Sequence, residues 1–326
     1  MSNYNRLLTN IGSLLEKARQ QVYTTVNHFL VQTYWNIGKD IVEFEQQGKQ
    51  RAEYGGELLL RLSADLAAQH GKGFSRSNLQ YMRQLYLNYP KCQTLSGELS
   101  WSHYLELLEI NNDLTRSFYE KQSIGERWSV RELKRQKNSM LFERLALSKD
   151  KGGVLELSRK GQLIQKPEDA IKDPYILEFL GLDERTKYTE MDLEEQVITK
   201  LKSFILELGK DFLFVDRQKR ITISNRHYYI DLVFYHRILR CFVLIDLKLG
   251  ELTHADTGQM SFYLNYYKQN EVREGENEPI GLILCASKKH ELAKYILTEK
   301  NMFASEYKLR LPSEQLLKEK LKKLLP

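Results

Sequence analysis

The stretch that decides the fold reads Tyr228-Tyr-Ile-Asp-Leu-Val-Phe-Tyr-His-Arg-Ile-Leu-Arg-Cys-Phe-Val-Leu-Ile-Asp-Leu-Lys248. Two apolar runs, each interrupted by one aspartate, flank a short polar segment, which is typical of two buried strands joined by a hairpin. With residues 237–240 as a four-residue loop, His236 faces Cys241 and Asp231 falls opposite Asp246. Directly paired side chains lie about 5 Å apart at Cβ. This register therefore predicts two neighbouring carboxyl groups.

Charged groups on such strands need a partner, because burying an unpaired charge is costly. Lys248 follows Asp246 by two residues, so strand alternation places both side chains on one face of the sheet. Two interpretations stay open at this point. The charges form an internal salt bridge at the strand end, or a divalent cation lies between Asp231 and Asp246 and relieves the repulsion of two close carboxylates.

A third acid, Glu194, lies on the apolar side of a helix predicted over residues 192–209, whereas Glu195 faces outward. The alternative for Glu194 is a helix-start charge that the helix dipole favours. Around this helix we expect a mixed sheet with helices on its faces, in the order α-β-β-β-α-β-α. In this order the two short strand-like runs at residues 212–215 and 220–224 count as one hairpin arm. The remaining elements are predicted as strands over 212–215, 220–224, 228–235, 241–248 and 280–286, and as helices over 253–269 and 289–300.

The first half of the chain shows only helical periodicity. Helices are predicted over residues 4–48, 56–70, 75–89, 101–119 and 129–147. A polar connector with glycines and prolines covers about residues 148–190. We therefore expect an α+β protein, with an all-α domain over residues 1–160 and an α/β domain over residues 161–326.

The composition is that of a globular protein, with 42% hydrophobic and 28% charged residues. The net charge of +6 permits a polyanionic partner without requiring one. No apolar run approaches the roughly 18 residues that cross a bilayer, and the chain does not begin like a signal peptide, so we expect a cytoplasmic protein without membrane contact. Cys92, Cys241 and Cys285 lie far apart, which excludes a disulfide framework and a cysteine-rich zinc site as organising features.

Taken in order on helix and strands, Glu194, Asp231, Asp246 and Lys248 resemble the PD-(D/E)xK nuclease superfamily. Asp231 stands for the aspartate of the P-D element, whose proline is missing here, and Asp246-Leu247-Lys248 stands for (D/E)xK. Gln259, on the next predicted helix, matches an accessory polar position often seen in that superfamily. The chain also resembles the YhcG family over residues 229–236, 239–243, 258–263 and 280–285, and in its first half and connector over residues 101–104, 118–119, 128–133, 173–175 and 179–181.

The resemblance implies a bacterial DNA nuclease with a restriction-endonuclease-like C-terminal domain, of a family discussed beside restriction and defence genes. Asp246 departs from the family, which more often has glutamate at this position. The ligands expected for Mg²⁺ or Mn²⁺ are Asp231, Asp246 and the Leu247 carbonyl, with Glu194 binding directly or through water. Lys248 would orient the attacking water and offset charge on the phosphate, and Gln259 would position water or backbone.

Two segments are candidates for holding DNA. Residues 58–89 read as helix, turn and helix, and the second helix offers polar side chains suited to phosphates and base edges: Arg76, Asn78, Gln80, Tyr81, Arg83 and Gln84. Arg217, Lys219 and Arg220 would contact phosphates, or would form a solvated turn. The long N-terminal helices predict a homo-oligomer, a dimer through the helical domain, or docking of restriction or defence partner proteins. A non-catalytic DNA-binding or scaffold subunit and an RNA nuclease remain the alternative functions.

Overall fold

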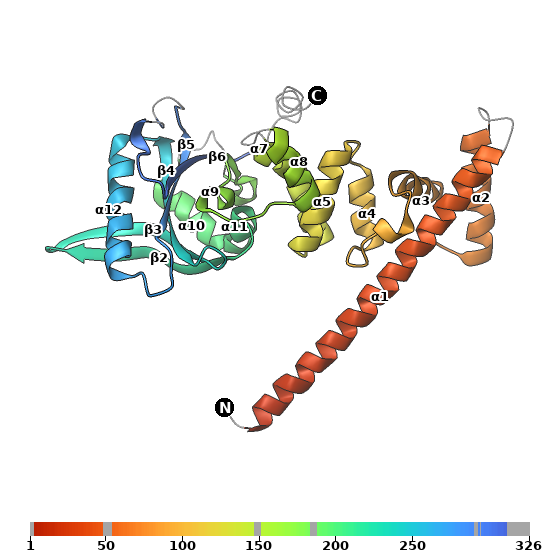
Figure 1. The fold of residues 1–326 in the computed structure, drawn as a ribbon, viewed down its shortest axis with the longest axis horizontal. Coiled ribbons are helices and arrows are strands. Elements are labelled where there is room, and N and C mark those ends of the chain that lie inside the picture. The colour runs from red at the N-terminus through yellow and green to blue at the C-terminus, as the bar shows by residue number, and fades with distance from the viewer. Residues whose placement is uncertain are drawn as a thin grey trace. The chain divides into compact units, whose positions relative to one another are not determined.

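The computed structural model describes residues 3–47, 54–146, 151–182, 188–289, 293 and 295–311. The chain divides into two compact units, residues 1–135 and 136–326. Unit 1 is helical throughout its described part, and unit 2 holds a six-stranded mixed sheet with helices (Figure 1). The α+β class predicted from the sequence is therefore confirmed. No helix within the described ranges is long and apolar enough to cross a membrane.

Unit 1 begins with one very long helix, followed by shorter ones. Its described elements are α1 (Asn3–Gln47), α2 (Tyr54–His70), α3 (Arg76–Asn88), the 3-10 turn η1 (Cys92–Thr94), α4 (Trp101–Leu108), α5 (Asp113–Gly125) and the first part of α6 (Val130–Asn138). The sequence predicted the first three helices. Ser75 caps α3, because its side chain accepts a hydrogen bond of 3.2 Å from the Asn78 backbone N–H.

The core of unit 1 lies where α1 crosses α3. Leu79 and Met82 of α3 are fully buried there against Ile41 of α1 and Leu59 of α2. The crossing is so close that a Cβ at Gly38 would lie 2.0 Å from the Met82 carbonyl oxygen. Only glycine allows this approach of two helix backbones.

Three helices that the sequence predicted as continuous are each broken in two. The 101–119 helix stops at α4 and restarts at α5, where Asn112 accepts a 2.9 Å hydrogen bond from the Thr115 backbone N–H. The 129–147 helix breaks at Met140, which has a φ of 54°. The 192–209 helix breaks at Lys200. In the first and third of these helices the apolar spacing continues across the break, so hydrophobic periodicity could not reveal it.

Unit 2 contains the sheet, whose strands lie in the order β1-β6-β5-β4-β3-β2. β2, β3 and β4 are joined by antiparallel hairpins, and β4, β5, β6 and β1 pair in parallel. The strands are β1 (Tyr175–Ile176), β2 (Phe212–Ile223), β3 (Arg226–His236), β4 (Cys241–Glu251), β5 (Ile280–Ser287) and β6 (Met302–Lys308). The helices are the end of α6, α7 (Leu141–Ala146), α8 (Lys151–Lys160), α9 (Pro167–Ala170), the 3-10 turn η2 (Glu178–Leu180), α10 (Glu190–Thr199), α11 (Leu201–Leu208) and α12 (His254–Asn270).

The sheet has a hydrophobic core on each face. Leu193 and Phe204, from α10 and α11, pack with Phe234 and Ile245 on one face. On the other face Met260 and Tyr263 of α12, with Tyr267, pack against Val233 and Leu244. The middle of the sheet is thus dry on both sides, which is why β4 and β5 read as continuous apolar runs.

Several elements differ from the sequence prediction. β2 is one strand of 12 residues rather than two runs. The connector contains α8, and the boundary expected near residue 160 falls at the end of this helix, inside unit 2. β1 and β6 were not predicted, because they are short or only weakly apolar and depend on pairing with each other and with β5. The helix expected over residues 289–300 lies partly outside the described residues.

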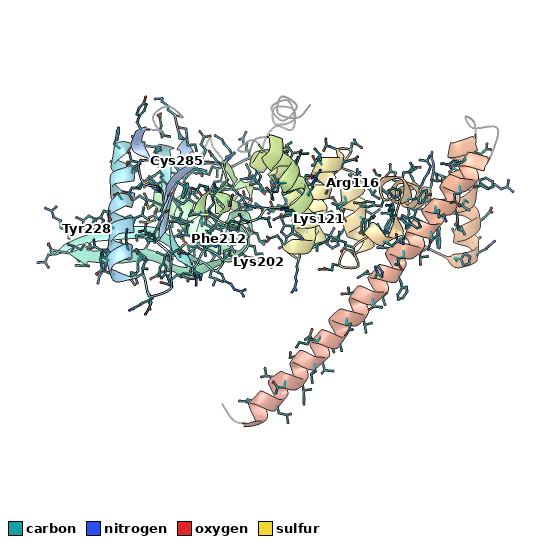
Figure 2. All side chains as sticks on the ribbon, in the orientation of Figure 1. Arg116, Lys121, Lys202, Phe212, Tyr228 and Cys285 are labelled. Carbon is teal, nitrogen blue, oxygen red and sulfur yellow. The ribbon has the colours of Figure 1, made fainter. Side chains whose placement is uncertain are left out.

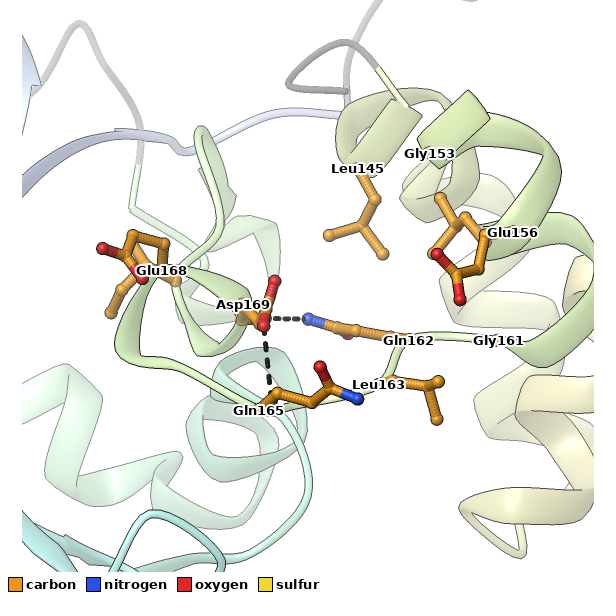
Figure 3. A pocket seen from close by; sticks show the side chains of 11 residues that line it. Leu145, Gly153, Glu156, Gly161, Gln162, Leu163, Gln165, Glu168 and Asp169 are labelled. Atoms are coloured by element: carbon orange, nitrogen blue, oxygen red, sulfur yellow. Dashed lines mark hydrogen bonds between the residues drawn. The ribbon is translucent and has the colours of Figure 1, made fainter. Parts of the chain in front are cut away.

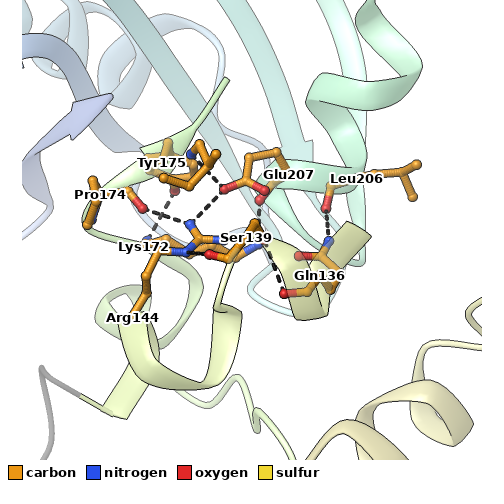
Figure 4. A network of polar contacts seen from close by, with 9 residues as sticks. Gln136, Ser139, Arg144, Lys172, Pro174, Tyr175, Leu206 and Glu207 are labelled. Carbon is orange, nitrogen blue, oxygen red and sulfur yellow. Dashed lines mark hydrogen bonds and ion pairs between the residues drawn. The ribbon is translucent and has the colours of Figure 1, made fainter. Parts of the chain in front are cut away.

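A buried polar network fastens α7 and the segment before β1 onto α11 (Figure 4). The Arg144 guanidinium lies 2.8 Å from Glu207 Oε1, and both side chains are almost completely inaccessible. Arg144 also donates to the carbonyls of Ser139 and Pro174. Glu207 also accepts a 2.9 Å hydrogen bond from the Ile176 backbone N–H. The network therefore ties α7 and β1 to α11.

The glycine crossing in unit 1 generates the first prediction. Gly38→Ala should lower the free energy of unfolding of the protein by about 1–3 kcal/mol or more, because the new methyl group forces two helix backbones apart. Gly12→Ala is the matched control in the same helix, since a Cβ there meets no atom within 4 Å. Relief of glycine's low helix propensity should make that variant more stable by up to about 1 kcal/mol. Thermal unfolding followed by circular dichroism measures both, and equal effects of the two variants would contradict the close crossing.

Candidate active site

The hairpin of β3 and β4 brings together the two aspartates singled out in the sequence. The strands pair from Leu232–Ile245 to His236–Cys241, which is the register predicted from the four-residue loop. Asp231 and Asp246 are the next residues in this register, just where the ladder of pairs ends. Their carboxyl groups lie close enough that each affects the pKa of the other.

Burial governs the chemistry of this carboxyl pair. The Asp246 side chain is 2% exposed. Burial, and then the charge of Asp231, raise the pKa of Asp246 to about 7. Burial also raises the pKa of Asp231, although the Leu247 backbone N–H donates a 2.8 Å hydrogen bond to its Oδ2 and lowers it in part. Near neutral pH, therefore, the pair holds a proton that a cation could replace.

Lys248 provides the positive charge of the site. Its Nζ lies 2.9 Å from Asp246 Oδ2, and the lysine side chain is only 16% exposed. Burial lowers the pKa of Lys248, but the nearby charges of Asp246, Glu190 and Asp231 outweigh this and leave the pKa raised. The ammonium group is therefore firmly protonated beside the carboxyl pair.

Glu194 of α10 joins the site through an intermediary, Gln218 of β2. The Gln218 side-chain amide donates to Glu194 Oε2 at 2.5 Å and to Asp231 Oδ1 at 3.2 Å. Burial raises the pKa of Glu194, and the hydrogen bond from Gln218 lowers it in part. The amide thus links two acids that would otherwise repel each other.

Gln218 is the residue that sequence reasoning missed. It has a φ of 46°, a left-handed conformation that a non-glycine residue rarely adopts. Residues in such strained conformations cluster at functional sites. The signal was present in the sequence: Ser224 and Asn225 form a two-residue hairpin turn, and counting back from the pair Ile223–Arg226 places Gln218 opposite Asp231.

Gln259 lies beside the site and contacts it indirectly. Its side-chain amide donates to the Tyr263 hydroxyl, which in turn donates to the Tyr229 carbonyl. The charges of Asp246 and Asp231 reach that hydroxyl and raise the pKa of Tyr263, after burial as the main cause. Gln259 therefore holds a tyrosine at the edge of the carboxyl pair.

The carboxyl pair suits a hard divalent cation. Within the described residues, no three His, Cys, Asp or Glu side chains are arranged as ligands of one ion. Mg²⁺, however, is commonly held by one or two carboxylates and keeps several waters, so Asp231 and Asp246 in contact fit its requirements. Glu194 would approach such an ion only if Gln218 released it or water bridged the gap.

The DNA-contact candidates in unit 1 are largely engaged in its own packing. Asn78 donates to the Gly73 carbonyl, and its Oδ1 accepts from the Trp101 indole N–H at 3.0 Å. Arg83 forms an ion pair with Glu45 at 2.8 Å. Gln80 is half-buried, whereas Arg76 is exposed. A DNA-reading role for this helix stays a prediction.

The other candidates lie on a two-stranded arm, residues 217–230, in which β2 and β3 pair only with each other (Figure 1). The ring of Tyr228, which Figure 2 labels on this arm, packs against the ring of Phe262 in α12, with centroids 4.6 Å apart and planes tilted by 46°, and so supports the arm. Arg217 is exposed at the base of the arm, where its charge acts on Glu194. Arg220 is exposed in a cross-strand pair with Tyr229, and Lys219 forms a 3.7 Å ion pair with Asp216.

A small cavity elsewhere in unit 2 contains none of the predicted site residues (Figure 3). Its volume is about 130 Å³, and Glu156, Glu168 and Asp169 are among its lining residues. Gln162 donates to the Asp169 carbonyl at 2.7 Å, and Asp169 accepts from the Gln165 backbone N–H at 3.2 Å. These internal hydrogen bonds stabilise the loop after α8.

Both halves of the chain match models of known protein families. Residues 168–324 match the model of the YhcG PDDEXK nuclease domain, and residues 10–144 match the DUF1016 N-terminal domain. The chain is 40% identical to "Putative nuclease YhcG" of Escherichia coli (strain K12), over 98% of this chain and 94% of that protein. Among solved structures, a repair endonuclease from Pyrococcus abyssi matches at 18% identity with a TM-score of 0.26, over 40% of this chain and 50% of that one. A complex of EndoMS with double-stranded DNA matches at 14% identity with a TM-score of 0.26. The match covers 41% of this chain and 51% of that one.

The buried carboxyl pair generates a prediction for the metal-free protein. Asp246 binds its proton up to about pH 7 in the folded state but only to about pH 4 in the unfolded chain. Between these values the folded state holds more protons, so the free energy of unfolding should fall as the pH rises. In wild type at pH 8, folding buries a charged Asp246 carboxylate, which lowers the free energy of unfolding. Asp246→Asn carries no such charge, so without metal at pH 8 this variant should be more stable than wild type by on the order of 2–4 kcal/mol.

Thermal unfolding in a chelator at pH 5 to 8 measures the effect. Glu195→Gln, at an exposed position on α10, is the matched control and should follow the wild-type profile. Parallel profiles for wild type and Asp246→Asn would show that the carboxyl groups do not share a buried proton.

Proposed function

Because the chain belongs to the YhcG family of PDDEXK nucleases, we propose that it is a metal-dependent endonuclease that hydrolyses phosphodiester bonds in DNA. The observation that carries the proposal is the convergence of Asp231, Asp246 and Lys248 at the end of the β3–β4 ladder, with Glu194 attached through Gln218. Two carboxyl groups could hold a divalent cation, and an ammonium group in contact with them could stabilise negative charge on a phosphate, so the set suits phosphoryl hydrolysis assisted by a metal.

Each residue of the site has a distinct part in the proposed reaction. Asp231 and Asp246 would hold Mg²⁺ or Mn²⁺ through carboxylate oxygens, with the Leu247 carbonyl as a further oxygen ligand. Such a cation, when bound, would supply Lewis-acid chemistry for the scissile phosphate and would lower the pKa of a nearby water. Lys248 orients the attacking water and stabilises negative charge that develops on the phosphate oxygens. Gln218 and Gln259 fix the orientations of Glu194 and Tyr263 around this centre.

The arm of residues 217–230 supports DNA as the substrate. A two-stranded β-ribbon fits the major groove of B-form DNA, and Arg217 and Arg220 supply exposed positive charge on this ribbon. Asn78 and Arg83 are engaged within unit 1, so the arm is the better candidate for contact near the site. A role in bacterial defence, restriction or DNA processing and a cytoplasmic location remain part of the proposal.

The substrate class is tested directly by incubation of the purified protein with single-stranded, duplex, branched and modified DNA and with RNA. Each substrate is offered with Mg²⁺, with Mn²⁺ and with a chelator. Metal-dependent cutting of DNA supports the proposal, and cutting of RNA alone would replace DNA as the substrate. Binding of DNA without any cutting would favour a scaffold subunit that keeps the nuclease fold.

Lys248 is the residue on which the proposed chemistry depends most. Lys248→Ala should lower the single-turnover cleavage rate at least about 100-fold, because it removes charge that stabilises only the transition state. DNA affinity should fall far less than the cleavage rate. Lys248→Arg should rescue poorly, since a planar guanidinium does not replace a compact ammonium group beside a water. Lys202→Ala, at an exposed position on α11, is the control; a Lys248→Ala protein that cuts at nearly the wild-type rate would refute the mechanism.

The arm generates a separate prediction about binding. A variant with Arg217→Ala and Arg220→Ala should bind duplex DNA more weakly, and the slope of log affinity against log salt should become shallower by about 2. The matched control replaces two exposed lysines on other elements of unit 2, Lys202 and Lys268, with alanine. Fluorescence anisotropy at several salt concentrations measures both. An unchanged slope in the arginine variant would mean that the arm does not contact phosphates.

A further inference from the structure

The N-terminal part of α1 carries an exposed apolar stripe. Among the side chains of α1 that the structure describes, Val31 is the first that is buried. Before it, eight large apolar side chains are each 46–66% exposed: Leu7, Leu8, Ile11, Leu14, Leu15, Val22, Val26 and Phe29. Side chains on this part of the helix stand clear of the other helices of unit 1 (Figure 2).

The spacing of this stripe is that of a coiled coil. Leu8, Leu15, Val22 and Phe29 recur every seven residues, and Ile11, Ala18 and Thr25 follow the first three of them by three residues. These are the a and d positions of three heptads. Leu7 and Leu14 widen the stripe on one side, as in helices that pack into bundles. None of these positions is charged.

This segment has little else to stabilise it as a helix in water. Residues 3–29 contain only four charged side chains, Arg6, Glu16, Lys17 and Arg19. The Glu16–Arg19 ion pair of 3.1 Å is about three-quarters exposed at both ends and contributes little. Thr24, Thr25 and Val26 are adjacent β-branched residues, which lower helix propensity. A lone helix of this kind is marginal in water, so its stability has to come from packing.

We propose that the stripe of α1, residues 7–29, is the surface through which a second copy of this chain binds. A heptad stripe is best complemented by another helix with the same repeat over three heptads. The next longest described helices, α2 and α12, have 17 residues each, which is shorter than three heptads. Among the described helices, only α1 itself is long enough to cover the stripe of another α1.

The apolar area of the stripe is large enough for a stable interface with a second copy of the chain. It extends over roughly 33 Å at 1.5 Å per residue. The eight side chains leave roughly 80–100 Å² each to be covered, so pairing buries close to the 800 Å² per partner of a standard interface. The absence of charge at the a and d positions means that two copies bring no like charges into the contact. This inference does not depend on the proposed nuclease activity.

Sedimentation velocity of the full chain over a range of concentrations tests the proposal. Wild type should sediment as a dimer or a larger assembly. Ile11→Asp with Leu15→Asp should weaken association at least about 100-fold, because each copy then places two charges inside the contact. Ser13→Asp with Asn10→Asp, on the other side of the same turns of α1, is the matched control and should associate like wild type.

Thermal unfolding keeps the result interpretable. Ile11 and Leu15 are about half exposed, so the aspartates enter no core of unit 1, and the cooperative melting of both units should persist in the variant. Its far-ultraviolet circular dichroism should show less helix, because the separated segment frays. A monomeric wild type at tens of micromolar, or an Ile11→Asp, Leu15→Asp variant that associates like wild type, would overturn the proposal.

Discussion

The close approach of the carboxyl groups of Asp231 and Asp246 is the constraint on which the candidate site depends. Two acids in contact in a dry place repel each other once both are charged. The apolar residues on either side of them are buried on both faces of the sheet, so neither strand can slip to separate the acids without exposing its core. The fold therefore imposes the contact, and Lys248 and Gln218 supply the positive charge and the hydrogen-bond donors that make it tolerable.

A second buried pair supports the layer of helices that carries Glu194. Arg144 belongs to α7, within the part of the chain that matches the N-terminal family model, yet its partner Glu207 lies in α11 of unit 2. Removing one member of a buried ion pair typically costs 3–5 kcal/mol, because the other charge remains in a dry place. Division of the chain at residue 160 would separate this arginine from Glu207. Because Arg144 is needed to pair with Glu207, the structural unit that contains the sheet begins at residue 136 rather than near residue 160.

The sequence predicted much of the fold because its signals are local. The apolar runs and the four-residue loop of the β3–β4 hairpin were sufficient to place Asp231 opposite Asp246, and the α-β-β-β-α-β order followed from periodicity. The helix breaks at Asn112 and Lys200 were not predictable from apolar spacing, which continues through both of them. β6 depends on partners distant in sequence. Gln218 was missed because β2 was read as two runs, and its place opposite Asp231 appears only when the Ser224-Asn225 turn fixes the register.

The charges around the site suggest an order of events under the proposed function. Glu190, Glu194, Asp231 and Asp246 outnumber Lys248, so a phosphate that approaches the metal-free site meets net negative charge. Electrostatic repulsion of this kind acts strongly where water is scarce. Arg217 stands at the base of the arm beside Glu194 and offsets part of that charge. Under the proposed function, a divalent cation held by Asp231 and Asp246 would offset the rest of the charge and take the place of the shared proton, so cation binding should precede productive binding of the phosphate. The acids that destabilise the metal-free protein would thus make the proposed binding of DNA at this site depend on the metal.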